Sequence, residues 1–239
     1  MKEAFLKGGV SASTGMRVYS LAEARGAAER IGYPVVVKRV DSSGSRGITV
    51  VEQPEKLDEA YYYASERTTK DYVLVEGFIR GTEIGVDGFV QDGQLVFLAP
   101  HTKFVYRGKN TTIPVGHAFP YHCTQEVYDE IGRQMQAAVS ATGADQCSVN
   151  ADVFVDGNKV SIIEMGGRTG ATCIPELISI YYGFDFYEKM LRSALGEQVE
   201  FNCTGSQPCM AKLLLSPVEG KITSIDKEGI RALEEQGVT

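Results

Sequence analysis

The sequence predicts an α+β fold with two lobes of antiparallel strands, and two kinds of pattern lead to this prediction. Asp92-Gly93 and Asp156-Gly157 each separate two apolar segments, and Asp-Gly is a strong signal for the tight turn of a β-hairpin. Amphipathic helical segments stand between these hairpins and do not alternate with single strands. Hairpins with intervening helices are typical of α+β proteins and not of a doubly wound parallel sheet.

A first, smaller lobe is expected over about residues 1–75. Ser20 and Glu23 form a capping box at the start of a helix over 21–31. A second helix is expected to begin at Pro54, because proline is favoured in the first helical turn. Apolar segments predict strands at 34–40, 47–51 and 72–78.

A second, larger lobe is expected over about residues 76–216. Its expected elements are the two hairpins, helices over 124–142 and 185–196, and a strand over 210–216. Residues 100–120 are expected to be irregular. Residues 217–239 are expected to form a truncated C-terminal tail.

Composition and charge argue against several classes of protein. Hydrophobic residues make up 43% and charged residues 23% of the 239-residue chain, as in ordinary globular proteins, and no segment approaches the ~18 apolar residues of a membrane span. The net charge of -7 argues against a nucleic-acid-binding protein. No signal peptide is recognised and the five cysteines are scattered, so a cytoplasmic protein with reduced thiols is expected. His101, His117 and His122 lack an evident Ser or Cys partner, and no catalytic role is expected of them.

Lys38 and the segment that follows it are the first candidate functional residues. Lys38 interrupts the apolar segment PVVVKRV, so it either faces water on an edge strand or points toward an anion. The serine- and glycine-rich segment 42–47 is suited to cradling phosphate oxygens with backbone N–H groups, although such segments also form ordinary tight turns. Neither a Walker A motif nor G-x-G-x-x-G is present.

Acidic side chains form the second group of candidates. The later Asp-Gly turn places Asp152 and Glu164 on neighbouring antiparallel strands, near the same end. Two carboxylates so placed repel each other unless a cation lies between them, and oxygen ligands suit Mg²⁺. Glu76 and Glu83 flank a segment whose backbone groups could meet an adenine edge. The alternative for each acid is a solvated side chain at a strand end.

Taken in order, these motifs resemble the ATP-grasp superfamily, in particular its branch of amino-acid ligases and carbamoyl-phosphate synthetases. The sequence contains V-V-V-K at 35–38, R-G-I at 46–48, V-E-G-F-I-x-G-x-E at 75–83 and I-I-E-x-x-x-R at 162–168. The resemblance covers nearly the whole chain. It implies that ATP lies between two α+β lobes, that a carboxylate is phosphorylated to an acyl phosphate, and that an amine or similar nucleophile displaces the phosphate.

The resemblance also implies a role for each matching residue. ATP contacts are implied for Lys38, the phosphate loop of Ser43, Gly44, Ser45, Arg46 and Gly47, the adenine hinge of Glu76, Phe78 and Ile79, and the ribose carboxylate Glu83. Catalytic contacts to the transferred phosphate are implied for Lys103 and Arg168, and Mg²⁺ binding for Asp152 and Glu164. Gly166 replaces the asparagine of the usual E-x-N-x-R pattern and removes one candidate ligand.

Partners and alternatives follow from the same resemblance. The substrates would be a small-molecule carboxylate and an amine, with no nucleic acid and no membrane, and a homodimer is left open. Family members carry an N-terminal domain ahead of this module, so the chain is expected to be an incomplete part of a ligase. A carboxylase or purine-pathway ATP-grasp enzyme, a nucleotide-binding regulatory module without turnover, and a structural domain stay open as alternatives.

Overall fold

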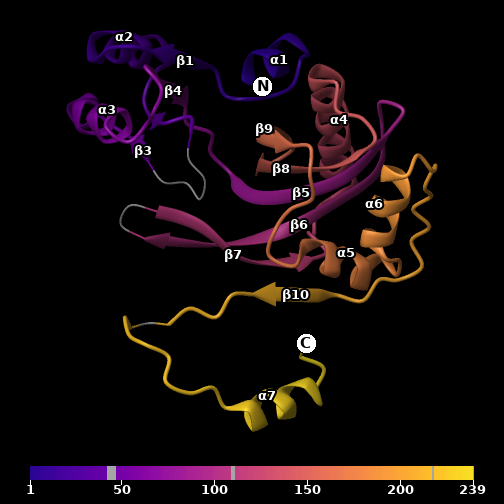
Figure 1. Ribbon diagram of the computed structural model, residues 1–239. Coiled ribbons are helices and arrows are strands. Elements are labelled where there is room, and N and C mark those ends of the chain that lie inside the picture. The colour runs from indigo at the N-terminus through magenta and orange to yellow at the C-terminus, as the bar shows by residue number, and fades with distance from the viewer. Residues whose placement is uncertain (42–46, 109–110, 217, 239) are drawn as a thin grey trace.

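Figure 1 shows the computed structural model of the protein, which describes residues 1–41, 47–108, 111–216 and 218–238. Among these residues a smaller sheet has the strand order β1-β4-β2-β3 and a larger sheet the order β10-β7-β6-β5-β8-β9. All the strand pairs in both sheets are antiparallel. Helices pack against both sheets, so the predicted α+β class is confirmed.

The small lobe consists of the smaller sheet and two helices that cover one of its faces. Its elements are β1 (Gly15–Val18), α2 (Leu21–Ile31), β2 (Val35–Lys38), β3 (Ile48–Val51), η1 (Pro54–Lys56), α3 (Leu57–Ser65) and β4 (Val73–Gly77). The predicted capping box is present, since Glu23 N donates to Ser20 Oγ and Tyr19 N donates to the Glu23 carboxylate. Alternate residues of β2, such as Val35 and Val37, are buried against the helices. The residues between them therefore face the other way.

The position of β2 decides between the two interpretations of Lys38. The strand lies between β4 and β3, so it is not an edge strand. The Lys38 side chain is only 18% exposed and lies on the face that the helices leave free. The water-facing edge-strand alternative is therefore wrong.

The large lobe consists of the larger sheet with helices on both faces. Its elements are β5 (Thr82–Gln91), β6 (Gln94–Gly108), β7 (Thr111–Phe119), α4 (Gln125–Thr142), β8 (Cys147–Asp156), β9 (Lys159–Gly166), α5 (Ile174–Tyr182), α6 (Phe186–Ala194) and β10 (Cys209–Lys212). Helix α4 buries Ile131 and Met135 against one face of the sheet. Helices α5 and α6 bury Ile178 and Phe186 against Phe97 on the other face. Both predicted hairpins are present, as β5–β6 and β8–β9.

The expectation of irregular backbone over 100–120 is wrong. Most of this segment belongs to the long strands β6 and β7, which pair with each other. The pairing register shifts between Phe104 and Val105, where β7 contains Pro114. A bulge of this kind accommodates a proline, which cannot donate to the ladder, and it breaks the alternation by which a strand is recognised in the sequence.

The N-terminus lies on the large lobe before the chain enters the small one. Phe5 of α1 (Lys2–Lys7) and Val10 are buried in the same core as α4, and Ile162 N of β9 donates to Ser11 O. Figure 1 shows α1 beside α4, with β1 leading away to the small lobe. The first residues therefore lie at the junction of the two lobes.

The C-terminal segment extends away from the large lobe after β10 and ends with α7 (Lys227–Glu234) (Figure 1). Of the predicted strand 210–216, only the first part pairs with β7. No helix in the described part of the chain is long and apolar enough to cross a membrane.

Gly85 on β5 is expected to tolerate no side chain. A Cβ atom there would lie 2.1 Å from Cε1 of the buried His101 ring. We expect Gly85→Ala to lower the free energy of unfolding by about 1–3 kcal/mol, as overpacking does elsewhere. Gly26→Ala in α2 is the control, because no atom lies within 4 Å of the added Cβ. Urea denaturation should show the loss in the first variant, and equal stability of Gly85→Ala and the wild type would contradict it.

Candidate active site

Two partly buried lysines share one carboxylate where the lobes meet. Glu76 Oε2 of β4 lies 3.1 Å from Lys38 Nζ and 2.9 Å from Lys2 Nζ. Ser13 Oγ donates to the same oxygen at 3.2 Å, and Lys2 Nζ donates to Ser13. The three charged side chains are at most 18% exposed. Together they carry one surplus positive charge, which favours an anion beside them.

The surroundings favour the ionised form of Glu76. Burial alone would raise the pKa of Glu76, but Lys38 and Lys2 together lower that pKa below its ordinary value. Burial lowers the pKa of Lys2, while Glu76 opposes the shift and Glu164 of the large lobe adds a weaker attraction. A carboxylate of the large lobe therefore acts electrostatically on a lysine of this cluster.

A second ion cluster lies on the larger sheet. Lys103 Nζ of β6 is 2.7 Å from Glu83 Oε1 of β5 and 2.7 Å from Asp152 Oδ1 of β8. The lysine side chain is 7% exposed. Burial would lower the pKa of Lys103, but Asp152 and Glu83 outweigh burial and raise it. Lys103 is therefore an ammonium ion held on the same face of the sheet as Phe97 and Ala99 of β6.

Asp152 and Glu164 are direct cross-strand partners of β8 and β9. Directly opposed residues of an antiparallel pair point to the same face of the sheet, so both carboxylates share one side, as the sequence predicts. Among the described residues, no cluster of three or more His, Cys, Asp or Glu side chains could hold a metal. Two carboxylates fit the way proteins usually hold Mg²⁺, with substrate phosphates and water completing the shell.

Arg168 and the glycine loop are the remaining parts of the predicted site. Arg168 is exposed after the end of β9, and its guanidinium donates to Thr169 O at 2.7 Å. Gly47 has φ +77° and accepts from Arg39 N, which closes the loop after β2. The predicted loop residues Ser43, Gly44, Ser45 and Arg46 lie outside the described residues.

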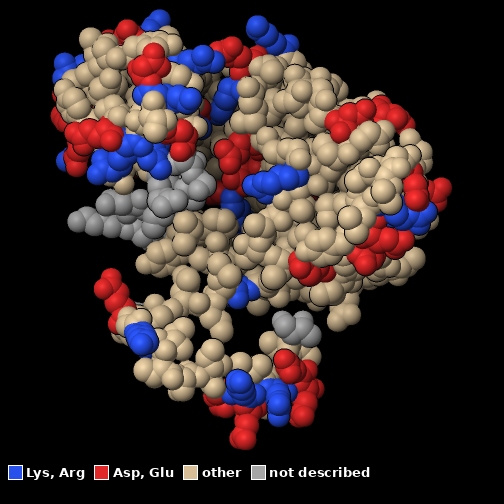
Figure 2. Space-filling view, viewed as in Figure 1, with Lys and Arg blue, Asp and Glu red and all other residues tan. Residues whose placement is uncertain are grey.

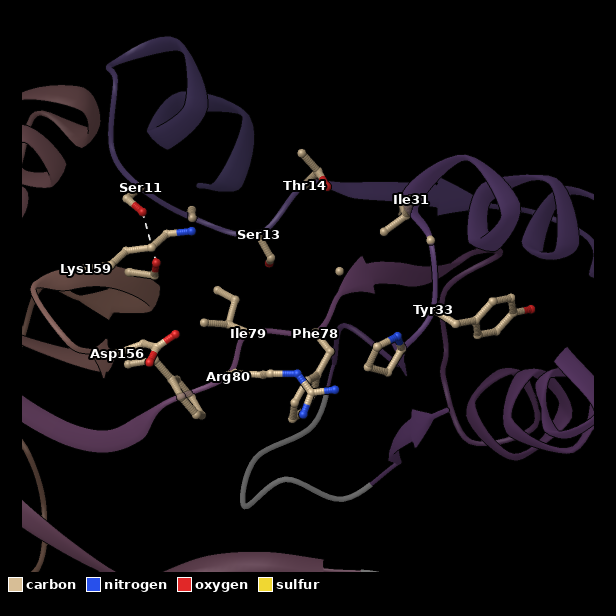
Figure 3. A pocket seen from close by; sticks show the side chains of 16 residues that line it. Ser11, Ser13, Thr14, Ile31, Tyr33, Phe78, Ile79, Arg80, Asp156 and Lys159 are labelled. Carbon is tan, nitrogen blue, oxygen red and sulfur yellow. Dashed lines mark hydrogen bonds between the residues drawn. The ribbon is translucent and has the colours of Figure 1, made fainter. Parts of the chain in front are cut away.

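The predicted hinge connects the lobes between β4 and β5. Gly77 N donates to Thr14 O and Phe78 N donates to Pro34 O, so the small lobe holds its first two residues. A pocket of about 470 Å³ borders the hinge, lined by Phe78, Ile79 and Arg80 and by residues of both lobes (Figure 3). Neither Lys38 nor Glu76 lines this pocket.

The charged residues of both lobes meet in one groove. Figure 2 shows Lys and Arg side chains in blue and Asp and Glu side chains in red, gathered between the small lobe at the upper left and the rest of the molecule. The Lys2–Lys38–Glu76 cluster carries one surplus positive charge, and the Lys103–Glu83–Asp152 cluster carries one surplus negative charge. Such an arrangement can bind a polyanion together with a divalent cation.

Sequence reasoning missed two features of this region. Lys2 was given no role, because nothing in its local sequence marks it and only the path of α1 brings it to Glu76. The pairing of His101 with Asp87 was also missed, since these residues lie on different strands and only the register of β5 and β6 brings them together.

The comparisons with known proteins agree with this geometry. Residues 31–176, more than half of the chain, match the ATP-grasp domain family. The chain is 32% identical over 176 residues to a D-alanine–D-alanine ligase of Halorhodospira halophila, covering 71% of this chain and 56% of the ligase. It is 30% identical over 162 residues to the carbamoyl phosphate synthase large chain of Clostridium acetobutylicum, covering 66% of this chain and 15% of that one.

Solved structures show the same fold. An L-amino acid ligase from Bacillus licheniformis superposes with a TM-score of 0.79 at 20% identity, covering 98% of this chain and 56% of that chain. Phosphoribosylglycinamide synthetase from Anaerococcus prevotii superposes with a TM-score of 0.67 at 33% identity, covering 82% of this chain and 49% of that chain.

These matches define the class as a protein with the ATP-grasp fold. The chain belongs to the ATP-grasp family, as its motifs predict. It spans little more than half the length of the D-alanine–D-alanine ligases it matches, and 15% of the carbamoyl phosphate synthase chain.

Proposed function

We propose that this chain is the nucleotide-binding module of an ATP-dependent carboxylate–amine ligase. It binds MgATP in the groove, a carboxylate is converted to an acyl phosphate, and an amine displaces the phosphate. The observation that carries the proposal is the Lys2–Lys38–Glu76 cluster beside the end of β9, where Met165 N donates to Met1 Sδ at 3.4 Å and Glu164 stands opposite Asp152. Lysines on one side and paired carboxylates on the other match the charges of a nucleotide triphosphate and its metal ion.

Each proposed role follows from the position of the side chain. Lys2 and Lys38 would bind phosphate oxygens as partly buried cations. Glu83, at the start of β5 beside the hinge, would accept from the ribose hydroxyls, and the backbone of Phe78 and Ile79 would meet the adenine edge. These assignments rest on placement and on the family motifs.

The catalytic assignments concern the charge of the transferred phosphoryl group. Asp152 and Glu164 would hold Mg²⁺, which when bound neutralises charge on the phosphates. Lys103 enters the reaction already protonated, because its carboxylate partners raise its pKa. Arg168 is exposed and free to turn toward an anion in the groove.

The test of this function is calorimetric titration with ATP in the presence and absence of Mg²⁺. We expect binding that strengthens with Mg²⁺, and adenine preferred over guanine because a guanine edge would leave hinge groups unpaired. A folded protein that does not bind ATP with Mg²⁺ present would refute the proposal. Substrate-dependent ADP release, screened over amino acids and other small carboxylates, would then identify the substrates.

Lys38→Ala is expected to weaken ATP binding by about 1–3 kcal/mol, the scale of one charged hydrogen bond. The cluster would lose its surplus positive charge, since Glu76 would then neutralise Lys2 alone. Titration with MgATP measures the change. Lys70→Ala is the matched control, because Lys70 is exposed on the small lobe away from Glu76. Unchanged affinity in folded Lys38→Ala would remove Lys38 from the site.

A further inference from the structure

A row of buried polar side chains crosses the larger sheet next to Lys103, on the same face. Asp87 lies on β5, His101 on β6 and His117 on β7; the first two are fully buried and His117 is 5% exposed. His117 is the direct cross-strand partner of Lys103, and His101 precedes Lys103 by two residues on the same strand. All three therefore share the face of the sheet that carries the ion cluster. The proposed function gives none of them a role.

Asp87 lies within hydrogen-bonding distance of three nitrogen atoms. Its Oδ1 accepts from Gly170 N at 2.8 Å, and its Oδ2 accepts from Asn150 Nδ2 at 2.8 Å and lies 3.0 Å from His101 Nε2. Gly170 belongs to the segment between β9 and α5 that carries Arg168. A Cβ at Gly170 would lie 2.4 Å from Ile174 Cδ1, so only glycine lets this segment come so close.

The same carboxylate constrains the protons of both histidines. Gly170 N and Asn150 Nδ2 can only donate, so both Asp87 oxygens act as acceptors, and a neutral His101 that donates to Oδ2 carries its proton on Nε2. His101 Nδ1 lies 3.2 Å from His117 Nδ1 and accepts the proton of that contact. The remaining nitrogen of His117, Nε2, is left without a proton. Burial, with His101 and Lys103 nearby, lowers the pKa of His117 to about 3, which agrees with a neutral ring.

We propose that Asp87 is a positioning residue of this active site. One of its oxygens anchors the Arg168 segment at Gly170, and the other fixes the tautomers of His101 and His117 beside Lys103. Asp87 itself touches no substrate in this proposal. Its consequence for catalysis rests on the proposed ligase function, whereas the proton positions do not.

The first test is ¹⁵N–¹H correlation NMR of the imidazole rings in the whole chain at pH 7. The chain contains only three histidines, so the spectrum can be assigned by replacing each with glutamine. We expect His101 protonated on Nε2 alone and His117 on Nδ1 alone. An imidazolium at His101, or a proton on its Nδ1, would overturn the assignment, and this measurement needs no Asp87 variant to fold.

The second test uses Asp87→Asn, with the exposed Asp71→Asn as its matched control. The amide keeps a single acceptor oxygen, which stays toward His101 Nε2 and Asn150 Nδ2 because it then satisfies two donors, and its NH₂ faces Gly170 N. We expect both tautomers to be kept, and the Gly170 amide to exchange with solvent about tenfold faster, because it loses its charged acceptor. Unchanged Gly170 exchange in a folded variant would overturn the proposal.

Two further readouts separate this role from general destabilisation. His101→Gln keeps a donor toward Asp87, so Gly170 exchange should stay within about twofold of the wild type; a loss of protection as large as in Asp87→Asn would count against the anchor. MgATP binding by the wild-type protein is the second readout, because it tests the proposed function without any change at Asp87. Wild-type protein that fails to bind MgATP would refute the ligase, while the NMR result would still decide the arrangement around Asp87.

Discussion

Lys103→Met is expected to lower the free energy of unfolding by about 3 kcal/mol, the lower end of the range for breaking a buried ion pair. Lys103 is 7% exposed, while its partners Glu83 and Asp152 are 19% and 31% exposed. Methionine fills similar space but leaves two carboxylates without their cation. Partial exposure of Asp152 moderates the loss, because water can solvate that carboxylate in part.

Mg²⁺ distinguishes the metal hypothesis from simple loss of an ion pair. In the variant, Glu83 and Asp152 lack the ammonium that neutralises them and Asp152 still stands opposite Glu164, so millimolar Mg²⁺ should raise the melting temperature more than it does in the wild type. Lys70→Met, at an exposed position, is the control and should show neither effect. Thermal unfolding with and without MgCl₂ measures both. If Mg²⁺ stabilises Lys103→Met no more than the wild type, these carboxylates do not form a cation site.

Local signals account for the elements that the sequence predicts well. The helix over 21–31 has the expected bounds because its first turn is capped by Ser20 and Glu23 and the chain leaves it at Gly32. Thr124 caps α4 in the same way. Both Asp-Gly turns join paired strands, because the turn geometry is encoded in two adjacent residues.

The elements that were missed depend on distant contacts. Helix α1 is one and a half turns long, and Phe5 is buried only because α4 lies beside it. Strand β1 is mostly exposed and exists through pairing with β4. In strands β6 and β7, a bulge and a proline interrupt the alternation of side chains by which a strand is recognised in the sequence. In each case tertiary packing decides the structure and local propensity does not.

The candidate site shows the same difference between local signals and distant contacts. Asp152 and Glu164 could be paired from the sequence, since a two-residue turn fixes their register. Lys103 could be placed near the phosphates only through the family motif, and its ion pairs with two other strands could not be foreseen. Asp87 and Gly170 are 83 positions apart in the chain, and no sequence pattern near either residue predicts their contact.

The stability of the protein is expected to fall in mild acid because His117 resists protonation. Burial, then His101 and Lys103, lower its pKa from 6.5 to about 3, while nearby Asp87 opposes the shift. Between these two values the unfolded chain binds a proton that the folded chain does not, so stability is lost as the pH falls from about 6.5 toward 3. Between pH 6.5 and pH 4.5, His117 alone is expected to lower the free energy of unfolding by about 2 kcal/mol, since a full proton difference costs roughly 1.4 kcal/mol per pH unit.

His117→Gln isolates this contribution, because glutamine keeps a hydrogen-bonding side chain that does not titrate. Urea denaturation at pH 7 and pH 4.5 gives the acid-induced loss for each protein, and we expect the variant to lose about 2 kcal/mol less than the wild type. Asp and Glu titrations affect both proteins and cancel in the difference. His122→Gln is the matched control, since His122 is exposed and should leave the loss unchanged. Equal losses in wild type and His117→Gln would mean that His117 accepts a proton in the folded state, and the neutral imidazole beside Lys103 would have to be abandoned.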